Sequence, residues 1–267
     1  MFKPIIKGVI RFSYPSEGGF AKDFANATEH EAFLFDHDRL ERRFHLFESL
    51  TLPSLRGQTD GDYHLAVLTG EGLPAWALKR LQAGLADVPQ ARIVQLPRMN
   101  HYPATREALE QMPDDGATHV AGFRLDDDDA MHFETVERIR EIANGMAQIT
   151  DTEKPFAIGF NRGFFLDRSD RDNAITEVRE RSPIGIGLTL VVPIKQRSNV
   201  FRRNHRFLHQ FYDCYTDVSR PMFIRSVHED NDSGAVSTGA GKGMTRAEID
   251  TALQSGFGTD LATLKAL

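Results

Sequence analysis

Hydrophobic residues follow two alternating patterns through the first half of the chain. Short apolar runs, each the length of a buried strand, lie at residues 5–12, 63–69, 91–96 and 118–125. Between these runs, apolar residues recur every three or four positions, which is the spacing along one face of an amphipathic helix. In the first such segment we expect Asp38 to cap the helix, Arg43 to face outward and the helix to end near Pro53.

The following segments repeat this order of strand and helix. Helical spacing is found at Leu78, Leu81 and Leu85, over residues 104–112, and at Val136, Ile139, Ala143 and Met146. Alternating strands and helices joined by short connections predict a mostly parallel sheet covered by helices on both faces. We therefore expect an α/β fold that is Rossmann-like in plan.

The second half of the chain does not continue this regular alternation of strands and helices. It is predicted to contain a hairpin at residues 155–166, a buried strand at 184–194 and a helix at 201–215. A glycine-rich connection at residues 234–243 then leads to a final short helix. No linker divides the two halves, so we expect a single domain over residues 1–267 with two functional lobes.

The composition limits the partners and the compartment. The chain has 267 residues, with 32 Lys and Arg against 38 Asp and Glu, for a net charge of −6. This balance argues against a broad surface for nucleic acid or anionic lipid, so a phosphate site is expected to be local. The single cysteine, Cys214, is typical of a reducing compartment. Residues 1–11 lack a signal-peptide core, and the longest apolar region, residues 184–194, is shorter than the roughly 20 residues of a membrane helix. We expect a cytoplasmic protein.

Four consecutive carboxylates follow the fourth predicted strand, in the sequence RLDDDD at residues 124–129. In an open α/β sheet, ligands bind at the carboxyl ends of the strands, which is where these acids lie. Adjacent carboxylates repel one another unless a positive charge compensates them, and a divalent cation is the simplest such charge. Oxygen ligands favour Mg²⁺ or Mn²⁺. The alternatives are a solvated acidic turn and a loop stabilised by calcium.

Three motifs together resemble the family 2 type glycosyltransferases with the GT-A fold. They are S-x-x-x-Q-T within LPSLRGQT at residues 52–59, YPATR at residues 102–106, and D-x-D-D at residues 126–129. Over nearly its whole length, the chain is most similar to a bacterial group of rhamnosyltransferases. The resemblance implies transfer of a sugar from a nucleoside-diphosphate sugar to a hydroxyl acceptor, with Mn²⁺ or Mg²⁺ as cofactor. It also implies a nucleotide-sugar-binding half at residues 1–130 and an acceptor half at residues 131–267.

The resemblance assigns roles to the acidic run and to a late histidine. Asp128 is expected to bind the metal, Asp126 to contact the ribose or a metal-bound water, and Asp129 to support the loop. His228 resembles the late histidine that many GT-A enzymes supply to the metal. The strand pattern leaves the register open, because a shift of one residue turns every side chain to the other face. Asp127 is therefore a rival, which we place among the nucleotide-sugar-binding residues.

Several charged residues are candidates for contacts with the donor. Guanidinium groups match the geometry of phosphate oxygens, and the candidates for diphosphate contacts are Arg106, Arg124 and Arg162. Arg11 follows the first strand and could bond to the base or ribose, whereas Glu71 stands where the family usually has an Asp that touches the nucleobase. The three candidates for diphosphate contacts could equally form surface ion pairs, and Arg11 could equally be a charge at a strand edge. The basic patch at residues 197–209 could meet an acidic acceptor or be a solvated face.

The acceptor side needs a group that removes the proton from the attacking hydroxyl. The candidates are Glu229, Asp230, Asp217 and His205. The acceptor is expected to be a glycan, a lipid or a small molecule, with no nucleic acid partner, and the enzyme could be peripheral at the inner membrane. Two other classes share an acidic loop after a strand: phosphohydrolases of the haloacid dehalogenase type, and non-enzymatic metal-dependent carbohydrate-binding proteins.

Overall fold

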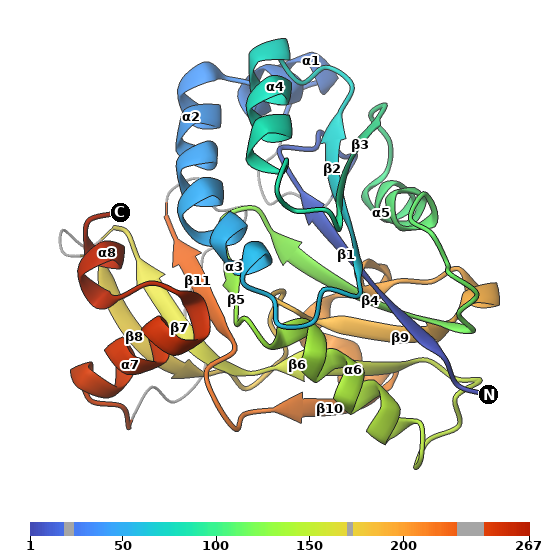
Figure 1. Ribbon diagram of the computed structural model, residues 1–267. Coiled ribbons are helices and arrows are strands. Elements are labelled where there is room, and N and C mark those ends of the chain that lie inside the picture. The colour runs from blue at the N-terminus through green and yellow to red at the C-terminus, as the bar shows by residue number, and fades with distance from the viewer. Residues whose placement is uncertain (19–23, 170–172, 229–242) are drawn as a thin grey trace.

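A seven-stranded sheet forms the centre of the structure, a computed structural model that describes residues 1–18, 24–169, 173–228 and 243–267 (Figure 1). The strand order is β10-β6-β9-β4-β1-β2-β3. The strands are β1 (Pro4–Arg11), β2 (His64–Gly70), β3 (Ala91–Leu96), β4 (His119–Asp126), β6 (Phe156–Phe160), β9 (Thr189–Pro193) and β10 (Asp213–Asp217). Strand β9 runs antiparallel to its neighbours β4 and β6, and the other pairings are parallel. The predicted mostly parallel sheet is confirmed.

Helices cover both faces of this sheet, as predicted. One face is covered by α2 (His37–Leu46), α3 (Leu52–Arg56), α4 (Ala75–Gly84) and α6 (Thr135–Met146), and α2 is preceded by α1 (Ala27–Leu34). The other face is covered by α5 (His101–Glu110). Side chains of strand β1 alternate between the two faces of the sheet. Ile6 and Ile10 pack in the hydrophobic cluster under α2, α3, α4 and α6, whereas Val9 packs in the cluster under α5.

A smaller sheet lies beside the main one and helps to build the site. Its order is β5-β11-β7-β8. The strands are β5 (Ala130–Met131), β11 (Phe223–Val227), β7 (Arg162–Asp167) and β8 (Ala174–Arg179), and α7 (Arg246–Phe257) and α8 (Leu261–Lys265) pack on it (Figure 1). Strand β5 directly follows the acidic run, and β11 ends one residue before His228. Pairing of β5 with β11 therefore brings these two parts of the chain together.

The first long helical segment differs from the prediction at both ends. Asp36, rather than Asp38, caps α2 by accepting a hydrogen bond from the backbone N–H three residues later at 2.9 Å. The segment passes through a π-helical turn, η1 (Phe47–Thr51), and ends at Arg56 rather than near Pro53. Proline lies in the first turn of α3, where its missing N–H is tolerated.

The predicted hairpin at residues 155–166 is wrong. Strands β6 and β7 pair into two different sheets rather than with each other. Asn161 alone separates them, whereas the shortest common hairpin loops contain two residues. The chain thus crosses from the large sheet to the small one at this point. The buried strand expected over residues 184–194 is limited to β9.

The predicted helix at residues 201–215 is also wrong. This segment forms two 3₁₀ turns, η3 (Val200–Arg202) and η4 (His205–Gln210), followed by β10; a further 3₁₀ turn, η2 (Ile194–Gln196), follows β9. The side chains of Asn199 and Asn204 each accept a hydrogen bond from the backbone N–H two residues later, at 3.0 Å. Such local hydrogen bonds compete with the α-helix.

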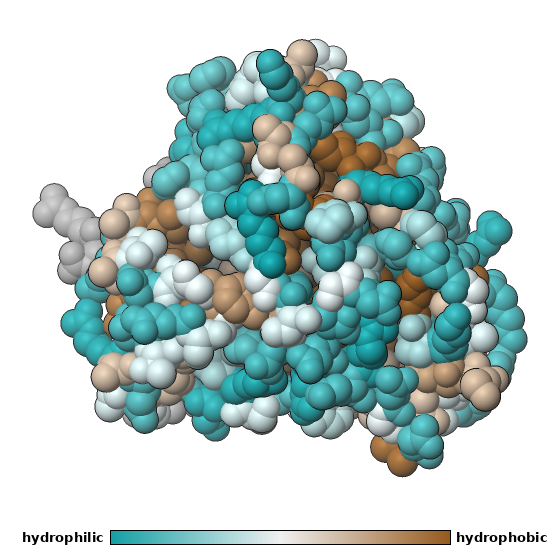
Figure 2. Space-filling view, viewed as in Figure 1, coloured by the Kyte–Doolittle hydropathy of each residue, from teal (hydrophilic) through white to brown (hydrophobic). Residues whose placement is uncertain are grey.

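The surface in Figure 2 is covered mostly by hydrophilic residues, with apolar side chains in scattered small areas. No helix within the described ranges combines the length and the apolar content needed to cross a membrane. The predicted glycine-rich connection at residues 234–243 falls outside the described residues except for residue 243.

Candidate active site

Arg11, Arg124 and Asp126 meet at the carboxyl ends of β1 and β4. The two strands pair with Arg11 opposite Asp126. The Nη2 atoms of Arg11 and Arg124 each lie 3.1 Å from a carboxylate oxygen of Asp126. Burial alone would raise the pKa of Asp126, but the guanidinium groups of Arg124 and Arg11 outweigh it and lower this pKa. Two guanidinium groups and one carboxylate leave a net positive charge, which suits an anionic ligand.

Close packing holds the Arg124 side chain in place. Its guanidinium carbon lies 5.0 Å from the centre of the Phe201 ring. A Cβ atom at Gly185 would come within 3.0 Å of the guanidinium, so glycine permits this close approach. In the described part of the chain, the Nε atoms of Arg11 and Arg124 are buried without a hydrogen-bond partner. Buried donors are costly when unpaired, and the oxygens of a phosphate could pair with them.

Two half-buried histidines border this group. The His101 ring lies edge-on to Phe201, with ring centres 5.2 Å apart. Burial, reinforced by Arg11 and Arg124, lowers the pKa of His101 to about 3. Burial and Arg124 similarly lower the pKa of His205 to about 4. Both imidazoles are therefore neutral at pH 7 and could hydrogen-bond to a ligand without adding charge.

These two histidines are expected to make the protein less stable at mildly acidic pH. Their folded pKa values, about 3 for His101 and about 4 for His205, lie below the unfolded value of about 6.5. The unfolded chain therefore binds protons that the folded chain excludes, and stability falls as the pH drops below 6.5. Between pH 7.5 and 5.5 the pair should cost about 3 kcal/mol.

The comparison is made by urea unfolding of the wild type and the double variant H101Q/H205Q at both pH values. The carboxyl groups titrate in both proteins, so the difference between their losses of unfolding free energy is due to the two histidines. The double variant should lose less stability than the wild type. His37, whose side chain is 68% exposed, supplies the control variant H37Q, which should behave as the wild type. A double variant with the wild-type pH dependence would contradict the expectation.

Asp127 and Asp128 pair with a buried arginine from α2. The Arg43 guanidinium donates hydrogen bonds to both oxygens of Asp127, and its Nη1 lies 2.8 Å from Asp128 Oδ2. Arg43 is 7% exposed. The prediction that Arg43 faces outward is wrong, because it lies three residues after Leu40 and four before Phe47 and so shares their apolar face. A side-chain cation thus compensates two of the four carboxylates.

His228 reaches the same carboxylate from the end of β11. Its Nε2 atom lies 2.9 Å from Asp128 Oδ2. Burial alone would raise the pKa of Asp128, but Arg43 and His228 together lower it. Asp128 is therefore an ionised carboxylate in contact with an imidazole, whereas Asp127 is bound on both oxygens by Arg43.

Asp129 anchors the acidic run on its other side. Its Oδ1 atom accepts a hydrogen bond from Ser226 N at 3.0 Å, and its backbone carbonyl accepts one from Thr51 Oγ1 at 2.8 Å. Burial and the neighbouring Asp128 raise the pKa of Asp129 well above its ordinary value. The segment from α2 to α3 therefore holds the acidic run at two points, through Arg43 and through Thr51.

Asp128 and His228 carry the kinds of atom that could bind a divalent metal ion. Their two atoms lie 2.9 Å apart, at hydrogen-bond distance, and Asp128 Oδ2 also accepts a hydrogen bond from Arg43 Nη1 at 2.8 Å. A bound metal would therefore replace the hydrogen bond between Asp128 and His228. Among the described residues, no three His, Cys, Asp or Glu side chains form a group that could hold a metal ion. Substrate phosphate oxygens and water commonly complete such a site.

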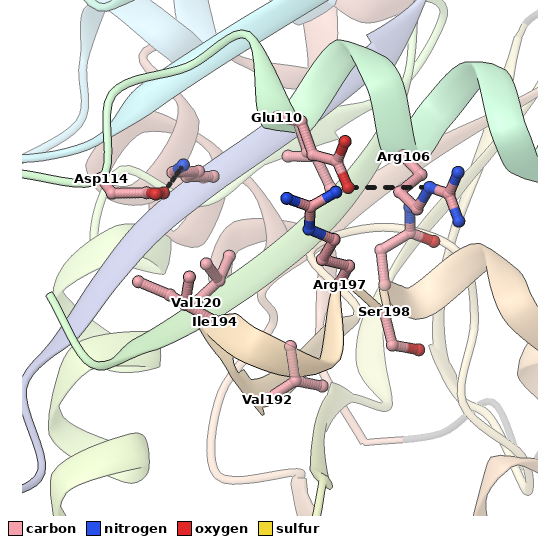
Figure 3. A pocket seen from close by; sticks show the side chains of 11 residues that line it. Arg106, Glu110, Asp114, Val120, Val192, Ile194, Arg197 and Ser198 are labelled. Atoms are coloured by element: carbon pink, nitrogen blue, oxygen red, sulfur yellow. Dashed lines mark hydrogen bonds and ion pairs between the residues drawn. The ribbon is translucent and has the colours of Figure 1, made fainter.

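Arg106 lies in different surroundings from the acidic run. It lines a cavity of 340 Å³ between α5 and the segment after β9, and Figure 3 shows Arg106 and Glu110 pointing toward each other. Arg106 Nε lies 3.6 Å from Glu110 Oε1. The cavity is also lined by Val120 near the start of β4, about 20 Å along the strand from Asp126.

Two further predicted site residues, Asp217 and Arg162, pair with side chains outside the acidic run. Asp217, at the end of β10, has its Oδ2 atom 2.8 Å from Arg138 Nε. Arg162 Nε lies 2.7 Å from Glu177 Oε1, and Glu71 is exposed after β2. Two candidates for the general base fall outside the described residues, namely Glu229 and Asp230.

Sequence reasoning missed Arg43, His101 and Phe201 as residues of the site. The position of Arg43 on the apolar face of its helix is a signal that was available. His101 and Phe201 approach Arg124 only because α5 and η3 pack on the same face of the sheet, and no local pattern indicates this.

Comparison with known proteins identifies the family. A family model with the description "Putative rhamnosyl transferase" matches residues 5–240, more than half of the chain. The chain therefore belongs to this rhamnosyl transferase family. The resemblance to rhamnosyltransferases that the sequence indicated is therefore confirmed. No curated protein matches the chain.

Solved structures provide distant likenesses. S. aureus TarS 1–349 in complex with UDP-GlcNAc has a TM-score of 0.45 and 11% identity, covering 87% of this chain and 62% of that one. The longer S. aureus TarS chain has a TM-score of 0.46 and 11% identity, covering 84% of this chain and 37% of that one. A putative nucleotide-diphospho-sugar transferase from Desulfovibrio desulfuricans G20 has a TM-score of 0.35 and 10% identity, covering 81% and 80%. The chain thus spans less than two thirds of the TarS chains it resembles.

Proposed function

We propose that this protein is a metal-dependent glycosyltransferase that moves a sugar, in this family a rhamnosyl group, from a nucleoside-diphosphate sugar to a hydroxyl acceptor. The acceptor would be a glycan, a lipid or a small molecule, and the enzyme would act in the cytoplasm or at the inner face of a membrane. The observation that supports this proposal is the Asp128–His228 pair beside the positively charged group of Arg11, Arg124 and Asp126.

Each side chain has a role in this proposal. Arg11 and Arg124 would bind the diphosphate through donors that are already buried and oriented, and Asp126 would contact the ribose. Asp128 and His228 would hold Mn²⁺ or Mg²⁺. Such a metal stabilises the negative charge that develops on the diphosphate as the sugar–phosphate bond breaks. The general base would come from Glu229 or Asp230, which follow His228 directly in the sequence.

Calorimetry tests the donor site directly. Titrations with UDP, dTDP and GDP, each with Mn²⁺ and with EDTA, should show binding that depends on the metal for the preferred nucleotide. The reason is charge: a protein of net −6 must attract a diphosphate locally, through the cation and the two arginines. Removing the metal should cost more affinity than removing the sugar. Tight binding of a free sugar in EDTA, with no heat from any diphosphate and Mn²⁺, would instead indicate a carbohydrate-binding protein.

His228→Ala should raise the Mn²⁺ concentration needed for half-maximal activity by about ten-fold or more. Loss of a metal ligand weakens metal affinity without emptying the hydrophobic core. The measurement is a Mn²⁺ titration of donor turnover, with His37→Ala as the control because that histidine is exposed. An unchanged titration curve for His228→Ala would remove His228 from the metal site.

A further inference from the structure

The segment at residues 202–211, next to the candidate site, exposes three arginines and two phenylalanines. They are Arg202, Arg203, Arg206, Phe207 and Phe211, and we call them together the basic-aromatic surface. The three arginines are exposed, and the two phenylalanines retain 48% and 49% of their accessible surface. Large apolar side chains with this exposure commonly mark interaction sites when they are grouped.

The charge of this region contrasts with that of the whole protein. Residues 181–212 contain six Lys and Arg and no Asp or Glu, in a chain of net charge −6. Within the part of the chain that the structure describes, Arg202, Arg203 and Arg206 form no ion pair. The Arg203 guanidinium instead lies 4.4 Å from the centre of the Phe211 ring. Among the described residues, no carboxylate therefore compensates the positive charge of these arginines.

The surface is firmly attached to the core. Leu208, between the exposed side chains, is fully buried in a cluster with Leu188 and Leu190. At the start of the segment, Phe201 packs on Arg124 of the candidate site. The exposed phenylalanines therefore project from an ordered turn whose position relative to the site is set by packing.

We propose that the basic-aromatic surface docks this protein onto a bilayer that contains anionic phospholipids. Arginines near a membrane surface bind lipid phosphates, and phenylalanines enter the boundary between headgroups and acyl chains. Peripheral binding strengthens with buried apolar area and with attraction to anionic lipids, and these side chains supply both. Phenylalanine, which has no polar group, gains from this boundary in a way that the phosphate backbone of a nucleic acid duplex does not offer.

Docking through the basic-aromatic surface would also indicate which acceptor the enzyme uses. This step alone rests on the proposed function. A site beside the membrane-bound surface would meet acceptor molecules that are anchored in the bilayer. The class of acceptor inferred is therefore a hydroxyl-bearing lipid or lipid-linked glycan. The docking itself depends only on the surface.

Sedimentation with vesicles tests the docking. The full chain is mixed with vesicles of phosphatidylglycerol and phosphatidylcholine in equal amounts, and with vesicles of phosphatidylcholine alone. We expect binding to the anionic vesicles only, weakening as salt rises because exposed charges are screened. R202Q/R203Q/R206Q should bind about 100-fold more weakly, since each arginine near an anionic surface contributes about five-fold. F207S/F211S should also bind more weakly to the same vesicles.

A matched variant controls for total charge. K79Q/R92Q/R246Q removes three exposed positive charges elsewhere and should bind as the wild type does, with unfolding temperatures confirming that all variants are folded. Equal weakening by both triple variants, no binding to the anionic vesicles, or tighter binding to a DNA duplex would each overturn the proposal. The assay contains neither nucleotide nor metal, so its failure is distinguishable from failure of the transferase proposal in calorimetry.

Discussion

Arg43→Met should lower the free energy of unfolding by about 3–5 kcal/mol, because it leaves two buried carboxylates without their cation. Asp127 and Asp128 are 2% and 4% exposed, so water cannot replace the lost guanidinium. Methionine retains much of the side-chain volume, so the lost free energy of unfolding comes from the missing positive charge rather than from a cavity. Urea unfolding near neutral pH measures it.

Arg80→Met is the matched control for this prediction. Arg80 pairs with Glu41 and Glu48, but its side chain is 33% exposed and those of its partners 44% and 37%. Ion pairs of this exposure contribute at most about 1 kcal/mol. Mn²⁺ should restore part of the stability of Arg43→Met, since a cation bound to the folded state stabilises it, and should not do so for Arg80→Met. Equal losses in the two variants would show that the pairing of Arg43 with the acidic run is not specially stabilising.

Asp128→Asn should reduce donor turnover by about 100-fold or more, because an amide is a poor ligand for a hard cation and the transition-state charge loses its support. Stability at neutral pH should fall, because Arg43 and His228 lower the pKa of Asp128 and the folded state therefore favours the ionised carboxylate. The loss should be smaller than that of Arg43→Met, because Arg43 keeps Asp127 as a partner. The measurements are turnover at limiting Mn²⁺ and urea unfolding of the same preparation.

Asp127→Asn removes the same charge from the neighbouring residue and so provides the comparison. Both carboxylates contact Arg43, but only Asp128 also contacts His228, at 2.9 Å. We expect Asp127→Asn to retain much more activity than Asp128→Asn. The reverse order would assign the metal to Asp127, which is the register that the sequence left open.

The alternation of apolar runs and helical faces by itself predicted the mostly parallel sheet with helices on both faces. Each strand is short and buried, and its hydrophobic pattern is local, so it can be recognised without knowing its neighbours. The acidic run at the end of β4 was predicted for the same reason, since its place after a strand is a property of consecutive residues. The family resemblance also rested on such runs.

Only the tertiary structure decided which charges meet. Arg43 is 84 residues from Asp127, and His228 is 100 residues from Asp128; β5–β11 pairing and the burial of α2 bring them together. The tertiary structure also places β6 and β7 in two different sheets, with the chain crossing between them at Asn161. No local pattern could show this. The physical reason is common to these cases: partners far apart in sequence are selected by packing over the whole chain, whereas composition and periodicity report only the local conformation.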